Sequence, residues 1–276
     1  MPELPEVETM CRGIAPVVGG KIQQLTLCDL PLKPIRLVPD LAKLKQRIEG
    51  KTIEGISRKG KRVVLSLSSD NLLVIEPRMT GLLLVSDPPN ESHLRLKFKL
   101  KNAGAKELLY WDRRGLGGVT LFTSEEFQQH FDRTLGPDAL TVSLKELTQR
   151  FQKSSREIKV ALLDQKAIAG IGNLYAAEIL HLSKIHPRRV CQTITKAEWK
   201  CLYQAMQGIL TEAILYEGST LSDGTYRNAL NKNGSYQNHH RVYAKAGEIC
   251  PLCKKAEIER IVQAQRSTFF CGKCQK

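Results

Sequence analysis

The motif CPLC at residues 250–253 is followed, after 17 intervening residues, by CGKC at residues 271–274. A two-residue spacer lets one tight turn present two sulfur atoms about 2.3 Å from a metal ion, and two such turns complete a tetrahedron. The predicted ligands are the thiolates of Cys250, Cys253, Cys271 and Cys274. Because four protein ligands fill the coordination sphere and leave no position for an activated water, we expect one structural Zn2+.

The segment between the two cysteine pairs predicts a β-hairpin. Residues 258–270 read IERIVQAQRSTFF, in which two strand-like runs flank a polar centre, and Arg266 stands near the tip. A cation on a hairpin that zinc holds rigid suits a phosphate group or a nucleic-acid groove.

The whole chain is strongly basic. Its 276 residues include 42 Lys and Arg against 28 Asp and Glu, a formal net charge of +14. Such a surplus attracts polyanions, and nucleic acid is the favoured partner because neutralising phosphates releases condensed counterions. No apolar run reaches the roughly 18 residues that span a bilayer. The acidic start MPELPEVETM lacks the apolar core of a signal peptide, so we expect a cytoplasmic protein without a membrane partner.

The first half of the chain, residues 20–122, is rich in predicted strands. Examples are residues 61–67, 72–75, 82–85 and 94–98. Short strands at this spacing, separated by turn residues, are typical of an antiparallel sandwich or barrel. A helix is expected to precede them, because residues 3–18 carry apolar side chains at helical intervals.

Three capping sequences predict helices in the rest of the chain. Thr123, Ser143 and Thr195 are each followed by Glu three residues later, and the third opens a long helix that ends near residue 218. The predicted fold is therefore α+β and multidomain. Its expected parts are a β-sandwich with an N-terminal helix at 1–134, a helical domain at 135–238 and a four-cysteine hairpin finger at 239–276.

A glycine-containing turn joins two further predicted helices, residues 158–164 and 174–182. The turn reads AGIGN at 169–173. Glycines let backbone amides approach a phosphate closely. The Asn173 amide and the N-terminus of the following helix can both donate to that phosphate, so this segment is a candidate DNA-binding element.

Pro2 offers a nucleophile. A small second residue favours removal of Met1, which would leave Pro2 with a free secondary amine. An α-amino group has a pKa of about 7.7–8.0, so a useful fraction is neutral at physiological pH. Its attack on an aldehyde-level carbon gives a cationic iminium, which is an electron sink for elimination at the neighbouring carbon. Glu3 and Glu6 stand beside it as candidate proton carriers.

Several motifs, in order along nearly the whole chain, resemble the bacterial formamidopyrimidine-DNA glycosylases. They are PELPEVET at 2–9, RKGK at 58–61, MTG at 79–81, DRRGLG at 112–117, GIGNLY at 170–175 and QRSTFFC at 265–271. The resemblance implies a DNA glycosylase and lyase of base excision repair. Such an enzyme acts as a monomer on damaged double-stranded DNA and removes oxidised purines, namely 8-oxoguanine and formamidopyrimidines.

The resemblance implies catalytic roles at five positions. Pro2 would displace the damaged base at C1′ of the sugar and form the Schiff base. Glu3 would carry protons during base release and ring opening, and Glu6 would support that site. Lys61 would bind phosphates around the lesion and serve in β-elimination, and Arg266 would bind phosphate and serve in δ-elimination.

The resemblance also implies DNA-binding positions. A glycosylase must flip the damaged nucleotide out of the duplex, and Met79, Arg114 and Leu116 would fill the hole that it leaves. The other predicted DNA-binding residues are His93, Arg156, Lys159 and Asn173.

Three positions depart from the family pattern. Glu76 replaces a phosphate-binding His, and an acid would repel phosphate unless Arg78 compensates. Leu116 replaces a Phe that would fill more volume. Ser154 aligns with a usual basic residue, although Arg156 stands close by. These departures bear on DNA affinity and opposite-base preference more than on the chemistry.

Two alternative functions stay open at the level of sequence. One is a glycosylase of the endonuclease VIII type, which removes oxidised pyrimidines. Leu4, Val7 and the segment 219–238, which resembles the loop that covers a flipped purine, favour the purine-specific branch instead. The other is a lesion-binding protein without catalysis, which Glu76 favours and the retained catalytic residues argue against.

Overall fold

The structure is a computed structural model that describes residues 2–29, 31 and 33–276. Met1, whose removal the sequence predicts, lies outside the described residues. By its internal contacts the chain divides into two compact units. The first comprises Met1–Asp132 with Ile214–Gln237, and the second comprises Arg133–Ala213 with Asn238–Lys276. The predicted division into three domains, after residues 134 and 238, stays a prediction.

The strands that the structure describes in the first unit form two sheets. They are β1 (Lys21–Leu27), β2 (Arg36–Val38), β3 (Ile53–Lys59), β4 (Arg62–Leu67), β5 (Asn71–Glu76), β6 (Gly81–Leu84), β7 (Leu94–Lys101), β8 (Glu107–Asp112) and β9 (Gly118–Thr123). One sheet has the order β1-β7-β8-β6 and the other β2-β9-β5-β4-β3. All neighbours are antiparallel except β2 and β9, which run parallel.

The two sheets share one apolar core. Leu25 and Phe98 from the first sheet and Leu65 and Ile75 from the second belong to a single buried cluster. Alternation along each strand directs these side chains inward. The predicted β-sandwich is therefore confirmed, with one parallel pair of strands at the β2 edge.

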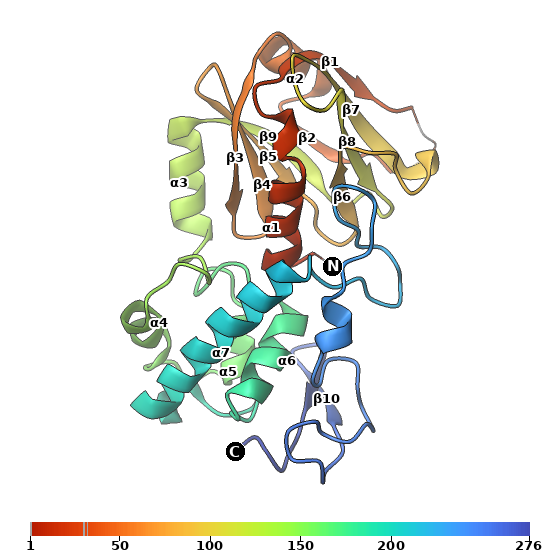
Figure 1. Ribbon diagram of the computed structural model, residues 1–276. Helices are drawn as coiled ribbons and strands as arrows, with labels where there is room; N and C mark the ends of the chain where they lie inside the picture. The colour runs from red at the N-terminus through yellow and green to blue at the C-terminus, as the bar shows by residue number, and fades with distance from the viewer. Residues whose placement is uncertain (1, 30, 32) are drawn as a thin grey trace. The chain divides into compact units, whose positions relative to one another are not determined.

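Helix α1 (Leu4–Gly13) contributes to the same core and contacts strands β3, β4 and β6 (Figure 1). Pro5 lies in its first turn, where the missing backbone N–H has no helical partner to lose. Val7 and Met10 are buried on its inner face. The helix predicted over residues 3–18 is shorter than expected, because the chain passes into a 3-10 turn at Ala15–Val17.

Two more helices belong to this part of the chain. Helix α2 (Leu41–Ile48) was not predicted from the sequence. Asp40 caps it by accepting the backbone N–H of Lys43 at 3.0 Å. The predicted capping box at the start of α3 (Ser124–Thr134) is confirmed. The N–H of Thr123 donates to Oε2 of Glu126 at 2.8 Å, and the N–H of Glu126 donates back to Oγ1 of Thr123 at 3.2 Å.

Helices follow, as predicted, in the rest of the chain. They are α4 (Leu144–Phe151), α5 (Ile158–Leu162), α6 (Asn173–Leu182) and α7 (Lys196–Leu215). Ser143 caps α4, because its Oγ accepts the N–H of Glu146 at 3.2 Å. Phe151 from α4 and Trp199 from α7 stack with ring centroids 6.0 Å apart in the core between these helices. No helix in the described part of the chain is long and apolar enough to cross a membrane.

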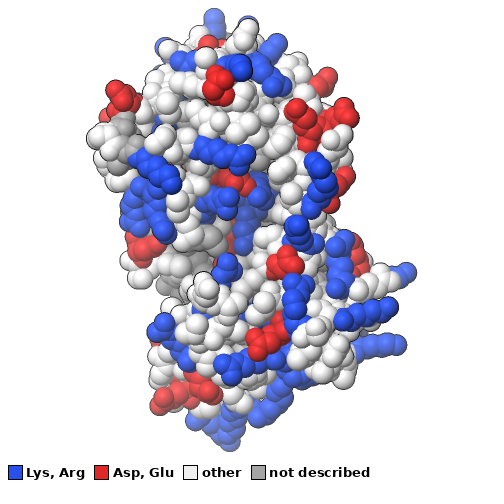
Figure 2. Space-filling view, turned by 180° about the vertical axis from the view of Figure 1, so that it is seen from behind, with Lys and Arg blue, Asp and Glu red and all other residues white. Residues whose placement is uncertain are grey.

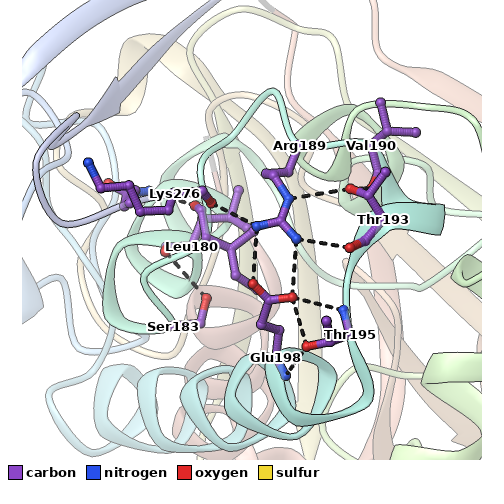
Figure 3. A network of polar contacts seen from close by, with 10 residues as sticks. Leu180, Ser183, Arg189, Val190, Thr193, Thr195, Glu198 and Lys276 are labelled. Carbon is purple, nitrogen blue, oxygen red and sulfur yellow. Dashed lines mark hydrogen bonds and ion pairs between the residues drawn. The ribbon is translucent and has the colours of Figure 1, made fainter.

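Arg189 joins the start of α7 to the last residue of the chain (Figure 3). Its Nη1 and Nη2 donate to the two carboxylate oxygens of Glu198, each at 3.1 Å, and this bond lowers the pKa of Glu198. Oε2 of Glu198 also accepts the backbone N–H of Thr195 at 2.8 Å, as the predicted capping box requires. Nη1 of Arg189 donates in addition to the backbone oxygen of Lys276 at 3.1 Å.

The predicted hairpin near the end of the chain is confirmed. Strands β10 (Glu259–Gln263) and β11 (Arg266–Phe270) pair antiparallel, with Gln263 opposite Arg266. The two residues between them, Ala264 and Gln265, have φ values of 47° and 60°. Two consecutive left-handed residues match a type I′ turn, whose twist suits a tight hairpin. Arg266 is thus the first residue after the turn.

Candidate active site and metal centre

The predicted nucleophile lies directly before the first turn of α1. Pro2 is buried, and Glu3, the N-cap residue of the helix, is 3 % exposed. The backbone N–H of Glu3 donates to Oε2 of Glu6 at 2.9 Å, which is one half of a capping box between these residues. The backbone that carries Pro2 is therefore fixed by its own sequence, and two carboxylates are held in the same turn.

The other oxygen of Glu6 binds a distant segment of the chain. Oε1 accepts the backbone N–H of Ser219 at 2.9 Å. Gly218, the residue before, has φ +77°, and a Cβ there would lie 2.9 Å from Oε1 and Cγ of Glu6. Only glycine tolerates both that conformation and that approach. The hydroxyl of Tyr226 also donates to the backbone oxygen of Glu6 at 3.4 Å, so the segment that resembles a purine-covering loop is anchored at α1.

Lys61 lies in the tight turn between β3 and β4. Gly60 begins this turn with φ +58°, a conformation that glycine adopts without strain. Nη1 of Arg58 donates to the backbone oxygen of Gly60 at 2.9 Å, and its Nε donates to Oε2 of Glu8 at 2.9 Å. Because Glu8 belongs to α1, the turn that carries Lys61 is tied to the helix that begins beside Pro2.

The three predicted void-filling residues lie on two loops that Asp112 joins. Asp112 is fully buried, and its Oδ1 accepts hydrogen bonds from the Thr80 hydroxyl and from the backbone N–H of Arg114. Thr80 follows Met79, and its Oγ1 accepts the same Arg114 N–H at 3.0 Å. Leu116 is 41 % exposed, as an apolar side chain that enters a duplex must be. Sequence reasoning missed Asp112, although it opens the motif at 112–117.

His93 ends a 3-10 turn at Glu91–His93 in the same unit. Its ring packs edge-to-face on Trp111, with centroids 5.4 Å apart. Its Nδ1 lies 3.1 Å from Oδ1 of Asn90, so the ring is held from the protein side at a half-buried surface position.

Glu76 is paired with two arginines. Nε of Arg62 donates to Oε1 of Glu76, and Nε of Arg78 forms an ion pair with Oε2 at a distance of 3.3 Å. Arg62 also lies over the ring of Phe131, 5.4 Å from its centroid. The side chain of Arg78 is 61 % exposed, whereas that of Glu76 is 22 % exposed. The more exposed group of this pair is therefore the cation of Arg78, as the expected compensation for Glu76 requires.

In the second unit, Asn173 opens α6 and Lys159 holds its side chain. Nζ of Lys159 donates to Oδ1 of Asn173 at 2.7 Å and to Oγ1 of Thr268 at 2.6 Å. Nδ2 of Asn173 donates to the backbone oxygen of Ser267 at 3.0 Å. Lys159 was predicted as a DNA contact, but it is 1 % exposed. The structure instead places it in the interior, where it orients Asn173 and strand β11.

Two predicted cations of the second unit do lie at its surface. Arg266 is exposed and directly precedes Ser267, so the contacts of Asn173 fix the strand where Arg266 projects. Arg156 is exposed and pairs with Asp164, whose Oδ2 lies 2.8 Å from Nη1. Figure 2 shows Lys and Arg side chains spread over the visible surface of each unit, as the net charge of +14 requires.

The four predicted zinc ligands gather at one place. Their sulfur atoms all lie within 4.8 Å of one another. Cys250 and Cys274 are 3.7 Å apart and Cys253 and Cys271 are 3.8 Å apart, measured between Sγ atoms. Ligands about 2.3 Å from a tetrahedral Zn2+ are separated by about 3.8 Å, so the set fits the ion. Backbone hydrogen bonds from Ala256 and Lys255 lower the pKa of the Cys253 thiol to about 6, whereas burial raises the pKa of the Cys271 and Cys274 thiols. Thiolates at all four positions therefore call for a cation such as zinc to stabilise them.

These features define a class of protein: a β-sandwich that carries the predicted nucleophile Pro2, followed by a helical segment and a zinc hairpin. Matches to three protein families lie in the same order. Residues 1–119 match the formamidopyrimidine-DNA glycosylase N-terminal domain, residues 135–225 the formamidopyrimidine-DNA glycosylase H2TH domain, and residues 247–276 a zinc finger found in that glycosylase and in IleRS.

Full-length relatives agree with these matches. The formamidopyrimidine-DNA glycosylase of Chloroflexus aurantiacus is 40 % identical over 278 residues, which cover 100 % of this chain and 98 % of that protein. That of Pediococcus pentosaceus is 39 % identical over 281 residues, covering 100 % and 99 %. The chain therefore belongs to the formamidopyrimidine-DNA glycosylase family.

Solved structures show the same fold. The Lactococcus lactis enzyme in complex with DNA containing an abasic site superposes with a TM-score of 0.87 at 33 % identity, over 99 % of each chain. The same enzyme in complex with DNA containing Fapy-dG gives a TM-score of 0.85 at 34 % identity, over 99 % of this chain and 100 % of that one.

The Glu76 cluster generates a prediction about Arg78. We expect Arg78→Ala to weaken binding to duplex DNA and to reduce the slope of log K against log salt by about 1, because one phosphate contact is lost. Adding Glu76→Gln should recover part of the affinity, because the acid is then neutral. Arg12→Ala is the matched control, since Arg12 is also exposed and paired with a glutamate of the same unit.

Fluorescence anisotropy titrations at several salt concentrations measure both quantities. A double variant that binds no better than Arg78→Ala alone would show that Arg78 does not compensate for Glu76.

Proposed function

We propose that this chain is a bifunctional DNA glycosylase and apurinic/apyrimidinic lyase of base excision repair that removes oxidised purines, 8-oxoguanine and formamidopyrimidines, from double-stranded DNA. The observation that carries the proposal is the buried first turn of α1, which holds Pro2, Glu3 and Glu6 together on a chain similar to formamidopyrimidine-DNA glycosylases over its full length.

Base release begins at Pro2. Once Met1 is removed, the Pro2 nitrogen attacks C1′ of the flipped nucleotide. A C–N bond forms to the amine, the bond from C1′ to the base breaks, and the base leaves with a proton. Glu3 carries protons as the base leaves and the sugar ring opens to the iminium. Glu6 positions this turn through its bonds to the Glu3 and Ser219 backbone.

Strand cleavage follows by two eliminations. The iminium makes the C2′ proton acidic, and its loss expels the 3′ phosphate in β-elimination. A second, δ-elimination expels the 5′ phosphate and leaves a one-nucleotide gap. Lys61 in the first unit and Arg266 in the second bind phosphates and stabilise the charge that develops on the leaving groups.

DNA binding combines wedge residues and phosphate contacts. Met79, Arg114 and Leu116, on the loops that Asp112 joins, fill the space that the flipped nucleotide vacates. The predicted backbone contacts are His93, Arg156 and Asn173. Lys159 serves DNA binding indirectly, by orienting Asn173.

Zinc takes no part in bond breaking and holds the hairpin that carries Arg266. The chain acts as a monomer in the bacterial cytoplasm, and its expected domains are residues 1–134, 135–238 and 239–276. Its relatives in bacteria support this location.

Removing the acid at Glu3 tests the mechanism. Glu3→Gln should lower the rate of 8-oxoguanine release at least about 100-fold, because general acid–base catalysis is lost. Its reaction with a preformed abasic site should fall less, because no base has to leave. Single-turnover assays on the two duplexes measure this difference. Glu125→Gln, an exposed glutamate of the same unit, is the control. Wild-type excision by Glu3→Gln would refute the assigned role.

A lesion panel tests the substrate class. We expect faster base release from 8-oxoguanine and formamidopyrimidine duplexes than from thymine-glycol duplexes, because the 219–238 segment resembles a loop that covers a purine. Rates are compared under single-turnover conditions opposite each normal base. Pro2→Gly, which loses the secondary amine, should slow release of every lesion and controls for contaminating enzymes. Faster thymine-glycol release would favour the endonuclease VIII type instead.

A further inference from the structure

Helix α6 contacts the zinc finger along one stripe. Asn173, Ala177 and His181 are spaced four residues apart, so they lie on the same face of the helix. The first of them binds the backbone of Ser267 in β11. Ala177 packs in a buried cluster with the zinc ligand Cys250. The third, His181, is a titratable residue that neither the zinc motif nor the proposed reaction uses.

The imidazole of His181 faces a zinc ligand. Its Nε2 lies 3.3 Å from Sγ of Cys250, and both side chains are fully buried. Its other nitrogen, Nδ1, is buried and has no hydrogen-bond partner among the described residues. His181 therefore makes its polar contact through Nε2, the nitrogen that faces the metal site.

The chemistry of the centre sets the direction of this contact. A thiolate that binds zinc carries no proton, so its sulfur can only accept a hydrogen bond, and the imidazole must be the donor. Zn2+ with four thiolates bears two net negative charges in a buried site. Donation of an N–H group to one sulfur withdraws electron density from it and stabilises that charge, as partners outside the ligand set do at other metal sites.

We propose that His181 is a positioning residue of the zinc centre, which donates its Nε2–H group to the thiolate of Cys250 and slows the release of zinc. The contact also connects two parts of the proposed DNA-binding surface, namely Asn173 and Arg266. Helix α6 begins at Asn173 and ends near His181. The finger that Cys250 helps to close carries Arg266.

The finger has other attachments that do not involve His181. Glu178 is fully buried and accepts the backbone N–H groups of Arg241, Val242 and Tyr243 at 2.9, 2.9 and 2.8 Å. Lys159 of α5 binds Thr268 in strand β11 of the finger. A variant at His181 is therefore expected to fold and to keep the finger in place.

The experiment compares His181→Phe, which lacks a donor, with His181→Gln, whose amide can donate. Transfer of zinc to the chromogenic chelator pyridylazoresorcinol should be about 10-fold faster or more in His181→Phe, and should return toward the wild-type rate in His181→Gln. Trp199→Phe is the matched control, because it removes from the same unit a buried ring N–H that has no partner in the described part of the chain. Its transfer rate should equal that of the wild type.

Two spectroscopic measurements separate this role from simple packing. In the cobalt-substituted protein, the thiolate-to-cobalt charge-transfer band should move to lower energy in His181→Phe, because a sulfur without the hydrogen bond releases electron density more readily. In the zinc-loaded wild type, long-range 1H–15N NMR correlations should show the proton of His181 on Nε2. Unchanged zinc transfer and an unchanged band in His181→Phe, or a proton on Nδ1 in the wild type, would overturn the proposal.

Discussion

The candidate site of the first unit depends on the hydrogen bonds that the carboxylate of Glu6 accepts. Glu6 is 2 % exposed, and burial of a carboxylate is costly unless its oxygens accept hydrogen bonds. One oxygen accepts the N–H of Glu3, and the other accepts the N–H of Ser219, 213 positions further along the chain. A single side chain therefore fixes the backbone beside Pro2 and the segment that resembles the purine-covering loop. Gly218 is required because any Cβ would push that segment away from Glu6.

In the second unit, helix α6 holds the predicted DNA-binding residues in place in a comparable way. This helix presents Asn173 at its start, and Lys159 orients that side chain from the interior while also binding strand β11. Glu178, whose burial raises its pKa, collects three backbone N–H groups at the entry to the finger. Zinc closes the finger itself. The exposed Arg266 is thus held on a hairpin that is braced from two sides, and a cation needs that rigidity to meet a phosphate in one position.

Helix starts and metal ligands could be predicted from the sequence, because short motifs determine them. The capping sequences at Thr123 and Thr195 predicted helix starts, because each involves residues only three positions apart. The four cysteines could be predicted as metal ligands because each pair has a two-residue spacer that suits zinc. The burial of Lys159 could not be predicted, since it depends on Thr268, 109 positions away. The pairing of Glu76 with Arg62 similarly depends on the register of β4 and β5, which the sequence pattern leaves undetermined.

One measurement tests directly whether the amine of Pro2 is the nucleophile. The protein is incubated with duplex DNA containing an abasic site, the Schiff base is reduced with borohydride, and the cross-linked peptide is located by tandem mass spectrometry. We expect the sugar remnant on the nitrogen of Pro2, in protein that lacks Met1. A remnant on Lys61 or on another lysine, with Pro2 unmodified, would contradict it.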